Sequence, residues 1–310
     1  MNWRTVDGRK SSFVIVVVLL LLVSLTTLAI AIPETARIDS GCCASGELLA
    51  KDFSAYYTAG WRLFHDPAQI YFSGFLGDGE PAILPQPQGY KYLPSFLLLV
   101  FPFLAVPYGS ALVAFDIFQF ALLPLIAFMI YYLLKGKSLA VASVVVALVL
   151  VLPIPLPTIH WSISFSYYWQ WAEGQCKVLE TFLLLSALAL ARSGRPRSAG
   201  VAYAFAAFDP RLAILAAPLM LAYTKDVRTT AIYTAGTLVV SNLALFYPPT
   251  FVGFVKMVFT SGALTPPYPY TFVPIIALAA LMIVDRDAVI SALRGLGWGT
   301  VSSSAPEMQK

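Results

Sequence analysis

Long runs of apolar residues alternate with short polar segments along most of this 310-residue chain. A transmembrane helix needs about 20 predominantly apolar residues, and several runs reach or approach that length. The pattern predicts eight membrane-spanning segments, over residues 12–32, 109–134, 138–157, 178–191, 198–208, 212–223, 230–247 and 272–284. A further apolar stretch, residues 93–107, is shorter and is interrupted by Pro94, Pro102 and Pro107. We interpret it as an interfacial or re-entrant helix because proline breaks a helix interior.

Composition supports an all-α fold, a polytopic bundle of about eight transmembrane helices. Apolar residues make up 59% of the chain and charged residues 12%, against about half and a quarter in a soluble domain. This excludes disordered, collagen-like and coiled-coil classes. It also excludes an outer-membrane barrel, whose strands alternate over about ten residues. Residues 1–310 therefore read as one integral membrane domain.

Lysine and arginine predict which way the bundle faces, because they are enriched on the cytoplasmic side of membrane proteins. A cytoplasmic N-terminus places most of the 20 basic residues inside, including those at 4, 9, 10, 135, 137, 192, 195, 197, 225, 228, 286 and 294. Counting 93–107 as a full span would move several of these clusters outside. Both termini are then cytoplasmic, and residues 285–310 are expected to be a frayed, nonessential cytoplasmic tail.

The irregular segments all fall on the outer face in this arrangement. They are a first loop over 33–92, a second over 158–177, a short turn at 209–211 and a fourth segment over 248–271. Long loops on one face of a rigid scaffold commonly carry function. We therefore expect the working site at the outer membrane face.

The first outer loop contains an amphipathic helix, predicted over residues 52–64. Aromatic and small residues recur on one face, at 53, 56, 57, 60, 61 and 64. Asp52 stands at the start of this helix, where a carboxylate can cap the first turn. The alternative is a functional one, in which Asp52 is a general base held at the membrane surface.

Three short sequences resemble one family of membrane enzymes. They are Asp52-Phe53…Tyr56-Tyr57…Ala59 with Tyr92-Leu93-Pro94, then Glu173-Gly174-Gln175, then Ser198-Ala199-Gly200…Phe208-Asp209-Pro210. Their order and spacing resemble the GT-C superfamily of glycosyltransferases. The resemblance is closest to the polyprenyl-phosphate-mannose-dependent mannosyltransferases of glycosyltransferase family 87. It covers residues 51–223.

The resemblance implies a glycosyltransferase that moves a sugar, with mannose as first candidate, from a polyprenyl or dolichyl phosphate carrier. The acceptor would be a glycolipid, a glycan or a protein at the outer face. The family's first-loop aspartate acts as base for the acceptor hydroxyl, and this role falls on Asp52. The lipid-linked sugar is a co-substrate, and neither a cofactor nor a metal site is predicted. Expected partners are the donor, the acceptor, membrane lipids and a possible further subunit, and not nucleic acid.

The leaving phosphate needs a cation near the membrane surface. Arg211 is the main candidate because its guanidinium fork suits phosphate, and Lys91 is a second candidate. The alternative for Arg211 is an ion pair with the adjacent Asp209. Lys91 could instead extend its ammonium to the membrane surface, as lysines at an interface do.

The acceptor side is predicted to involve His160, Glu173 and Gln175 from the second outer loop, together with Tyr56. Histidine can assist proton transfer or bind hydroxyls. The alternative is that His160 is an ordinary loop residue and that the neighbouring aromatic residues form an interfacial belt.

Three departures from the family pattern keep a second hypothesis open. The family's Lys-Pro pair is Asp209-Pro210-Arg211 here, the second proline after Tyr92 is missing, and relatives usually continue with more spans. The rival is a non-enzymatic membrane protein, either a transporter or a subunit of a larger complex. Its key charge would be Asp116, inside the second predicted span.

Overall fold

Helices make up all the regular structure in the described part of the chain. The computed structural model describes residues 51–74, 76, 89–134, 176–260 and 272–295. The elements are α2 (Lys51–His65), η1 (Pro67–Gln69), α3 (Ser95–Val100), η2 (Phe101–Ala105), α4 (Tyr108–Leu133), α7 (Lys177–Arg192), α8 (Pro196–Ala206), α9 (Pro210–Tyr223), α10 (Val227–Ser241), η3 (Leu243–Phe246), α11 (Pro248–Thr260), α12 (Phe272–Val284) and α13 (Arg286–Gly295). The predicted all-α bundle is confirmed at this level.

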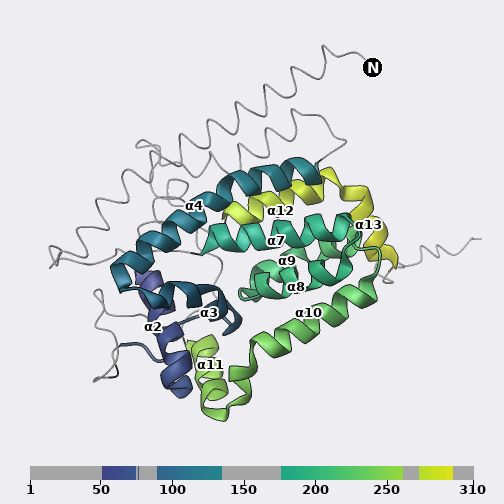
Figure 1. Ribbon diagram of the computed structural model, residues 1–310. Helices are drawn as coiled ribbons and strands as arrows, with labels where there is room; N and C mark the ends of the chain where they lie inside the picture. Colours follow the sequence, from purple (N-terminus) through teal and green to yellow (C-terminus); the bar gives the residue numbers. More distant parts are fainter. Residues whose placement is uncertain (1–50, 75, 77–88, 135–175, 261–271, 296–310) are drawn as a thin grey trace, which may run out of the picture.

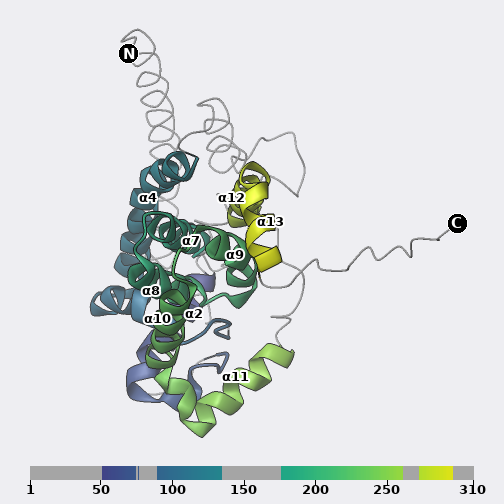
Figure 2. The same ribbon diagram turned by 90° about the vertical axis from the view of Figure 1, so that its right-hand side faces the viewer.

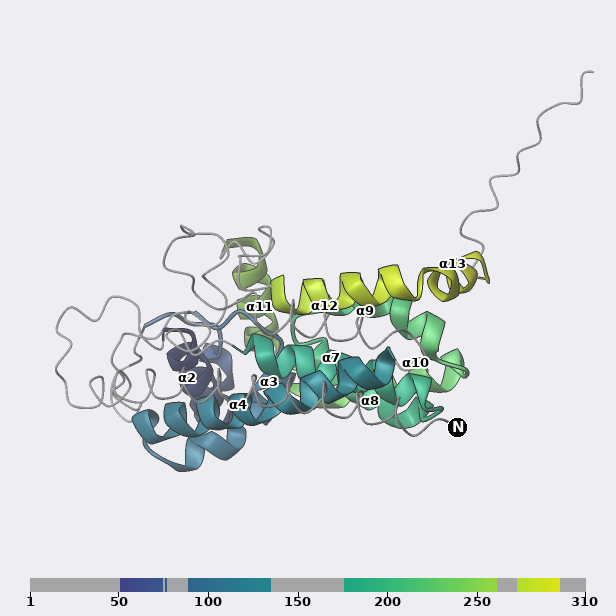
Figure 3. The same ribbon diagram turned by 90° about the horizontal axis from the view of Figure 1, so that it is seen from above.

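The helices form an elongated bundle with two distinct ends (Figure 1). α4, α7, α9 and α12 run in one direction, whereas α8 and α10 run in the other. We call the end that holds α2, α3 and α11 the site end, and the end that holds α13 the basic end; Figure 3 shows α2 and α13 at these opposite ends. The alternating direction agrees with the alternation predicted from the basic residues.

Local sequence signals explain the sharp turns between the central helices. α7 ends at Arg192, and Gly194 then adopts a φ of 76°, a left-handed conformation that favours glycine after a helix. Pro196 begins α8 and Pro210 begins α9, both at first-turn positions where proline is tolerated. Asp209 caps α9 and Asp226 caps α10. These signals make α7, α8, α9 and α10 reverse direction at each turn, so that α8 lies antiparallel to α7 and parallel to α10.

α8 and α10 pack closely at Gly200. A Cβ atom there would lie 2.5 Å from the carbonyl oxygen of Thr230, so only glycine permits this approach. The hydroxyl of Thr234 also donates to the Gly200 carbonyl at 3.2 Å. Small residues commonly allow such contacts between apolar helices.

Among the described helices, only α4 has both the length and the composition of a membrane crossing. The predicted spans over 198–208 and 212–223 correspond to α8 and α9, with 11 and 14 residues. At 1.5 Å per residue these helices are about 16 and 21 Å long, less than the ~30 Å hydrocarbon core. The predicted spans over 12–32 and 138–157 lie outside the described residues.

Three sequence predictions need correction. Residues 230–247 form not one helix but α10 and η3, which meet at Asn242; the side-chain oxygen of Asn242 accepts from the backbone N–H of Ser95. The segment 248–271 was expected to be irregular, but apolar residues within it build α11. The expected fraying of 285–310 is wrong for 285–295, because Asp285 pairs with Arg192 and α13 follows directly.

Within the stretch 93–107, α3 passes directly into η2, and Pro102 lies in the first turn of η2. The helical part, residues 95–105, is shorter than the length that a membrane crossing needs. Its interfacial position stays a prediction.

Candidate functional site

A buried group of charges lies at the site end of the bundle. The ammonium of Lys177 donates to Glu180 Oε2 and to Asp209 Oδ2, each at 2.8 Å. All three side chains are 1% exposed or less. Glu180 Oε1 has no hydrogen-bond partner in the described part of the chain. Burial of charges at this depth is costly unless they are paired, so the network must form as a unit.

The fold brings these charges together from two places. Lys177 and Glu180 share one face of α7, whereas Asp209 stands in the turn between α8 and α9. The segment before α3 is tied to the same turn, because the backbone N–H of Leu93 donates to the Phe208 carbonyl at 3.2 Å. This tie places the ring of Tyr92 over Lys177, with the ammonium 5.3 Å from the ring centroid.

Arg211 joins the network through Asp209. Its Nε donates to Asp209 Oδ1 at 2.9 Å and its Nη2 to Asp209 Oδ2 at 2.7 Å. The ion pair weighed as an alternative from the sequence is therefore present. The Arg211 side chain is still 37% exposed while Asp209 is 1% exposed. Arg211 is thus the member of the network that reaches the surface.

The charges in this network stabilise one another. Burial would raise the pKa of Asp209, but Lys177 and Arg211 outweigh burial and hold that pKa well below its usual value. Burial likewise disfavours the charged form of Lys177, yet the neighbouring carboxyl groups of Glu180 and Asp209 keep its pKa well above its usual value. Asp209 and Lys177 are consequently both ionised at neutral pH.

A second set of polar side chains adjoins the network. The Tyr56 hydroxyl donates to Cys176 Sγ at 3.7 Å, and Cys176 directly precedes Lys177. Burial raises the pKa of the Cys176 thiol to about 12, so it is protonated at neutral pH. Rings pack around this contact, with Tyr56 and Tyr92 centroids 5.7 Å apart.

Asp52 lies beside these phenols. It sits in the first turn of α2 and is half-buried, one helical turn before Tyr56. Burial raises the pKa of both Tyr56 and Tyr92 well above the usual value, and the charge of Asp52 adds to both shifts. Tyr92 also feels the charges of Lys177 and Asp209. Tyr92 therefore lies between the Asp52 side and the lysine side of the site.

The structure brings together three of the residues predicted from the sequence. Asp52, Tyr56 and Arg211 come from distant parts of the chain and share the site end. Lys91 is exposed, and within the described residues it makes no ion pair or hydrogen bond. The other three predicted residues, His160, Glu173 and Gln175, lie outside the described residues.

Sequence reasoning gave no role to Glu180 and used Tyr92 only as part of a motif. The signal for Glu180 was its place three residues after Lys177, since such a pair shares a helix face. No comparable signal existed for Tyr92, because its position depends on the contact between Leu93 and Phe208.

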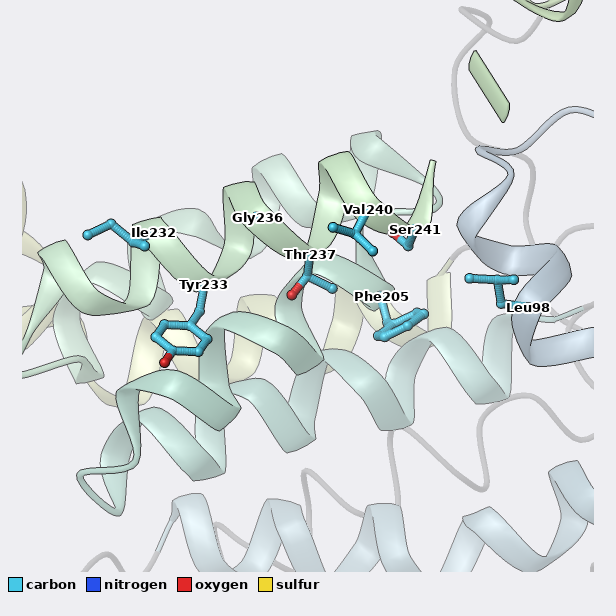
Figure 4. Close-up of a pocket in the computed structure, with 8 residues that line it drawn as sticks. All are labelled: Leu98, Phe205, Ile232, Tyr233, Gly236, Thr237, Val240 and Ser241. Atoms are coloured by element: carbon cyan, nitrogen blue, oxygen red, sulfur yellow. The ribbon is translucent and has the colours of Figure 1, made fainter. Parts of the chain in front are cut away.

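Two other features lie apart from this network. Asp116 in α4 is 4% exposed, and its Oδ1 has no partner in the described part of the chain. A groove of about 550 Å³ runs along α10 towards α3 and holds none of the predicted site residues (Figure 4). It is lined by Leu98, Phe205, Ile232, Tyr233, Gly236, Thr237, Val240 and Ser241.

The chemistry available at the site end is that of an acid, a fork of cationic donors and two phenols. Across the described ranges, no three or more His, Cys, Asp or Glu side chains gather as a metal site would. In comparisons with known proteins, the chain matches no family model, no curated protein and no solved structure.

Proposed function

We propose that this chain is an integral membrane glycosyltransferase that uses a polyprenyl or dolichyl phosphate sugar as donor. The sugar, with mannose as first candidate, would pass to a glycolipid, glycan or protein acceptor at the outer face. The observation that supports the proposal is that Asp52, Tyr56 and Arg211 lie at the same end of the bundle. These residues were predicted separately as base, acceptor contact and phosphate contact.

The surface of α10 supports the membrane part of the proposal. Lys225, Asp226 and Arg228 are exposed at its start, and no charged residue follows until Lys256. α10 has 15 residues and is about 23 Å long, and the apolar η3 follows after Asn242. Exposed apolar side chains lie along both, namely Ile232, Tyr233, Val239, Val240, Leu243 and Phe246.

The positions of the basic residues support the proposed sidedness. Arg192 ends α7, Arg286 begins α13, and both lie at the basic end. Enrichment of such residues on the cytoplasmic side would place the site end outside and both termini inside. The site would then face the compartment where a lipid-linked donor can be used without a nucleotide-binding domain.

In the proposed reaction Asp52 accepts the proton of the acceptor hydroxyl. The hydroxyl oxygen bonds to the anomeric carbon of the donor, and the bond from that carbon to the phosphate oxygen breaks. The electron pair leaves with the phosphate, whose new charge Arg211 would receive by charge-assisted hydrogen bonds. A single displacement of this kind inverts the anomeric centre.

The buried network would fix the phosphate contact in place. Asp209 accepts two hydrogen bonds from the Arg211 side chain and is itself held by Lys177. A guanidinium held this way loses little conformational freedom when a phosphate binds. Arg211 therefore combines exposure with a fixed orientation, whereas Lys91 is exposed and unconstrained.

A transfer assay with the donor tests this proposal. Purified protein in nanodiscs would receive radiolabelled polyprenyl-phosphate-mannose and a membrane lipid extract as acceptor pool. We expect label to move to a new species, and Arg211→Gln to raise the donor KM and lower kcat. Lys91→Gln is the matched control, with a smaller effect expected. Absence of transfer by folded wild-type protein, across several lipid-linked sugars, would contradict the proposal.

The second candidate is a transporter or a subunit of a larger membrane complex. The buried Asp116 favours it, because an ionisable group in a membrane-length helix commonly marks an ion or proton pathway. Under this hypothesis Asp116→Asn abolishes function and Asp52→Asn does not. The glycosyltransferase hypothesis makes the opposite prediction.

A further inference from the structure

α11 is apolar on two opposite sides. One side packs inward, where the Thr250 hydroxyl donates to the Pro67 carbonyl at 2.7 Å and Phe254 contacts Tyr71 with ring centroids 5.6 Å apart. The other side is exposed, with Phe251 at 51%, Val252 at 64% and Phe259 at 76%. A helix at a water-facing surface would carry polar residues on that outer side.

The exposed side of α11 continues the uncharged surface of α10. Through η3 and the following turn, Leu243, Phe246 and Tyr247 are all exposed. Figure 2 shows α11 away from α4 and α12, and Figure 1 shows it at the far end of α10. The apolar surface therefore extends along the bundle and then turns onto α11.

We infer that α11 lies along the outer membrane interface, with Phe251, Val252 and Phe259 against lipid acyl chains. This inference rests on the membrane part of the proposed function and not on the transfer reaction. With 13 residues, α11 is about 20 Å long, too short to cross a ~30 Å core. A helix of that length with an outward apolar side fits a position in the plane of the interface.

Two residues beside the apolar side are typical of that position. Tyr247 directly precedes α11, and tyrosine is enriched at membrane–water interfaces. Lys256 is exposed at the edge of the same side, where its long side chain can reach the lipid headgroups.

Lipid fits this surface better than a protein partner does. A protein interface usually has an apolar centre enclosed by a polar rim. From Ala231 to Phe259, the exposed residues are apolar, glycine, proline or tyrosine, with Lys256 as the charged exception. No polar border therefore separates the apolar surface of α11 from that of α10, as a protein interface would require.

Depth-dependent quenching tests the inference on the full chain. The substitutions Cys42→Ser and Cys43→Ser would leave the buried Cys176 as the one native cysteine. A cysteine introduced by Val252→Cys would then be labelled with an environment-sensitive fluorophore. The protein would be placed in phosphatidylcholine nanodiscs with a nitroxide near the headgroup or near the chain end. We expect the nitroxide near the headgroup to quench several-fold more than the deep nitroxide, and iodide in the water to quench little.

Two matched labels make each outcome decisive. Ser73→Cys, on an exposed polar residue near η1, should be quenched by iodide and not by either nitroxide. Val240→Cys, on α10, should be quenched best by the deep nitroxide. The inference about α11 is wrong if the label at position 240 is quenched by the nitroxides while the label at position 252 is quenched by iodide alone or by no quencher. If the label at position 240 is also quenched by iodide alone, the proposal that the bundle lies in a membrane is wrong.

Discussion

The two ends of the helix bundle hold their charges in different ways. At the site end, Lys177 is enclosed with Glu180 and Asp209, and all three are 1% exposed or less. At the basic end, Arg192 pairs with Asp285 at 3.2 Å, with 33% and 11% of the side chains exposed.

The basic end is a clamp that joins α4, α7 and α9 to the junction between α12 and α13. Arg192 on α7 also donates to the carbonyl of Leu133 at the end of α4. The Tyr223 hydroxyl at the end of α9 donates to Asp285 Oδ2 at 2.5 Å. Asp285 lies between α12 and α13, so the clamp has a clear structural purpose and needs no deep burial.

The burial of ionisable residues at the site end is not explained by such a structural role. A buried ion pair often stabilises a protein no more than apolar residues of similar size would. The burial of Lys177, Glu180 and Asp209 is therefore weak evidence that these residues serve stability alone. The proposed function gives them a second role, which is to hold the partly exposed Arg211 in a fixed orientation.

Removal of the central cation should have the largest effect on stability. Lys177→Met leaves Asp209 and Glu180 buried without their shared partner, and breaking a buried pair costs about 3–5 kcal/mol. Arg192→Met is the matched variant at the basic end. Partial exposure screens that pair, so we expect about 1 kcal/mol there. Thermal unfolding in detergent would measure both, and equal losses would show that the two ends do not differ.

For tyrosine hydroxyls, the loss of stability should be larger at the basic end than at the site end. Tyr223→Phe removes a short hydrogen bond to a carboxylate, which contributes about 1.5–3 kcal/mol when the acceptor is charged. Tyr56→Phe removes a long contact to a thiol, a weak acceptor, and should cost about 0.5 kcal/mol or less. Urea unfolding of the two variants measures this difference. A larger loss for Tyr56→Phe would mean that the phenol has a stronger partner than Cys176.

The shifted pKa values of Asp209 and Lys177 predict how the stability of the fold changes at extreme pH. The folded pKa of Asp209 is depressed, so its contribution is present above its unfolded pKa of about 3.9 and is lost as pH falls through the folded value. The folded pKa of Lys177 is raised, so its contribution is present below about 10.4 and is lost as pH rises through the folded value.

Melting temperatures of wild type and Asp209→Asn should therefore converge as the pH falls below about 4, where the stabilising contribution of the Asp209 carboxylate is lost. The comparison cancels titrating groups that lie far from Asp209 and that both proteins share. A difference that stays constant through this acid range would mean that the pKa of Asp209 is not depressed in the folded protein.

The smallest expected effect concerns thiol reactivity. Cys176 is buried, and its pKa of about 12 keeps it protonated, so a maleimide should modify it slowly. In a background of Cys42→Ser and Cys43→Ser, Ser193→Cys adds an exposed thiol at the basic end. We expect labelling of that thiol in the folded protein and labelling of Cys176 only after denaturation. Equal labelling rates in the folded state would show that the site end is open.

Much of the fold could be predicted from periodicity. The aromatic face over 52–64 correctly indicated α2, and the prolines of 93–107 correctly indicated that only a short helix forms there. α11 was missed because five prolines between 248 and 271 suggested a loop, although Pro248 and Pro249 only begin the helix. The ordered segment 285–295 was missed because its order depends on Arg192, far away in the sequence.

The site was predictable in part. Asp52 could be singled out because it stands at the start of an amphipathic helix, and Arg211 because it lies in a short turn between two apolar runs. The burial of Lys177 could not be foreseen, because it depends on Asp209 and on the packing of Tyr92. Sequence separation hides such contacts, so the role of Arg211 could be stated only as two alternatives.

The most direct test of the central claim compares two acids in one assay. The sugar-transfer rate would be measured for wild type, Asp52→Asn and Asp116→Asn, with folding checked by melting temperature. Loss of a general base costs about 100-fold or more, so we predict that loss for Asp52→Asn and a near wild-type rate for folded Asp116→Asn. Transfer by Asp52→Asn at the wild-type rate would contradict the account.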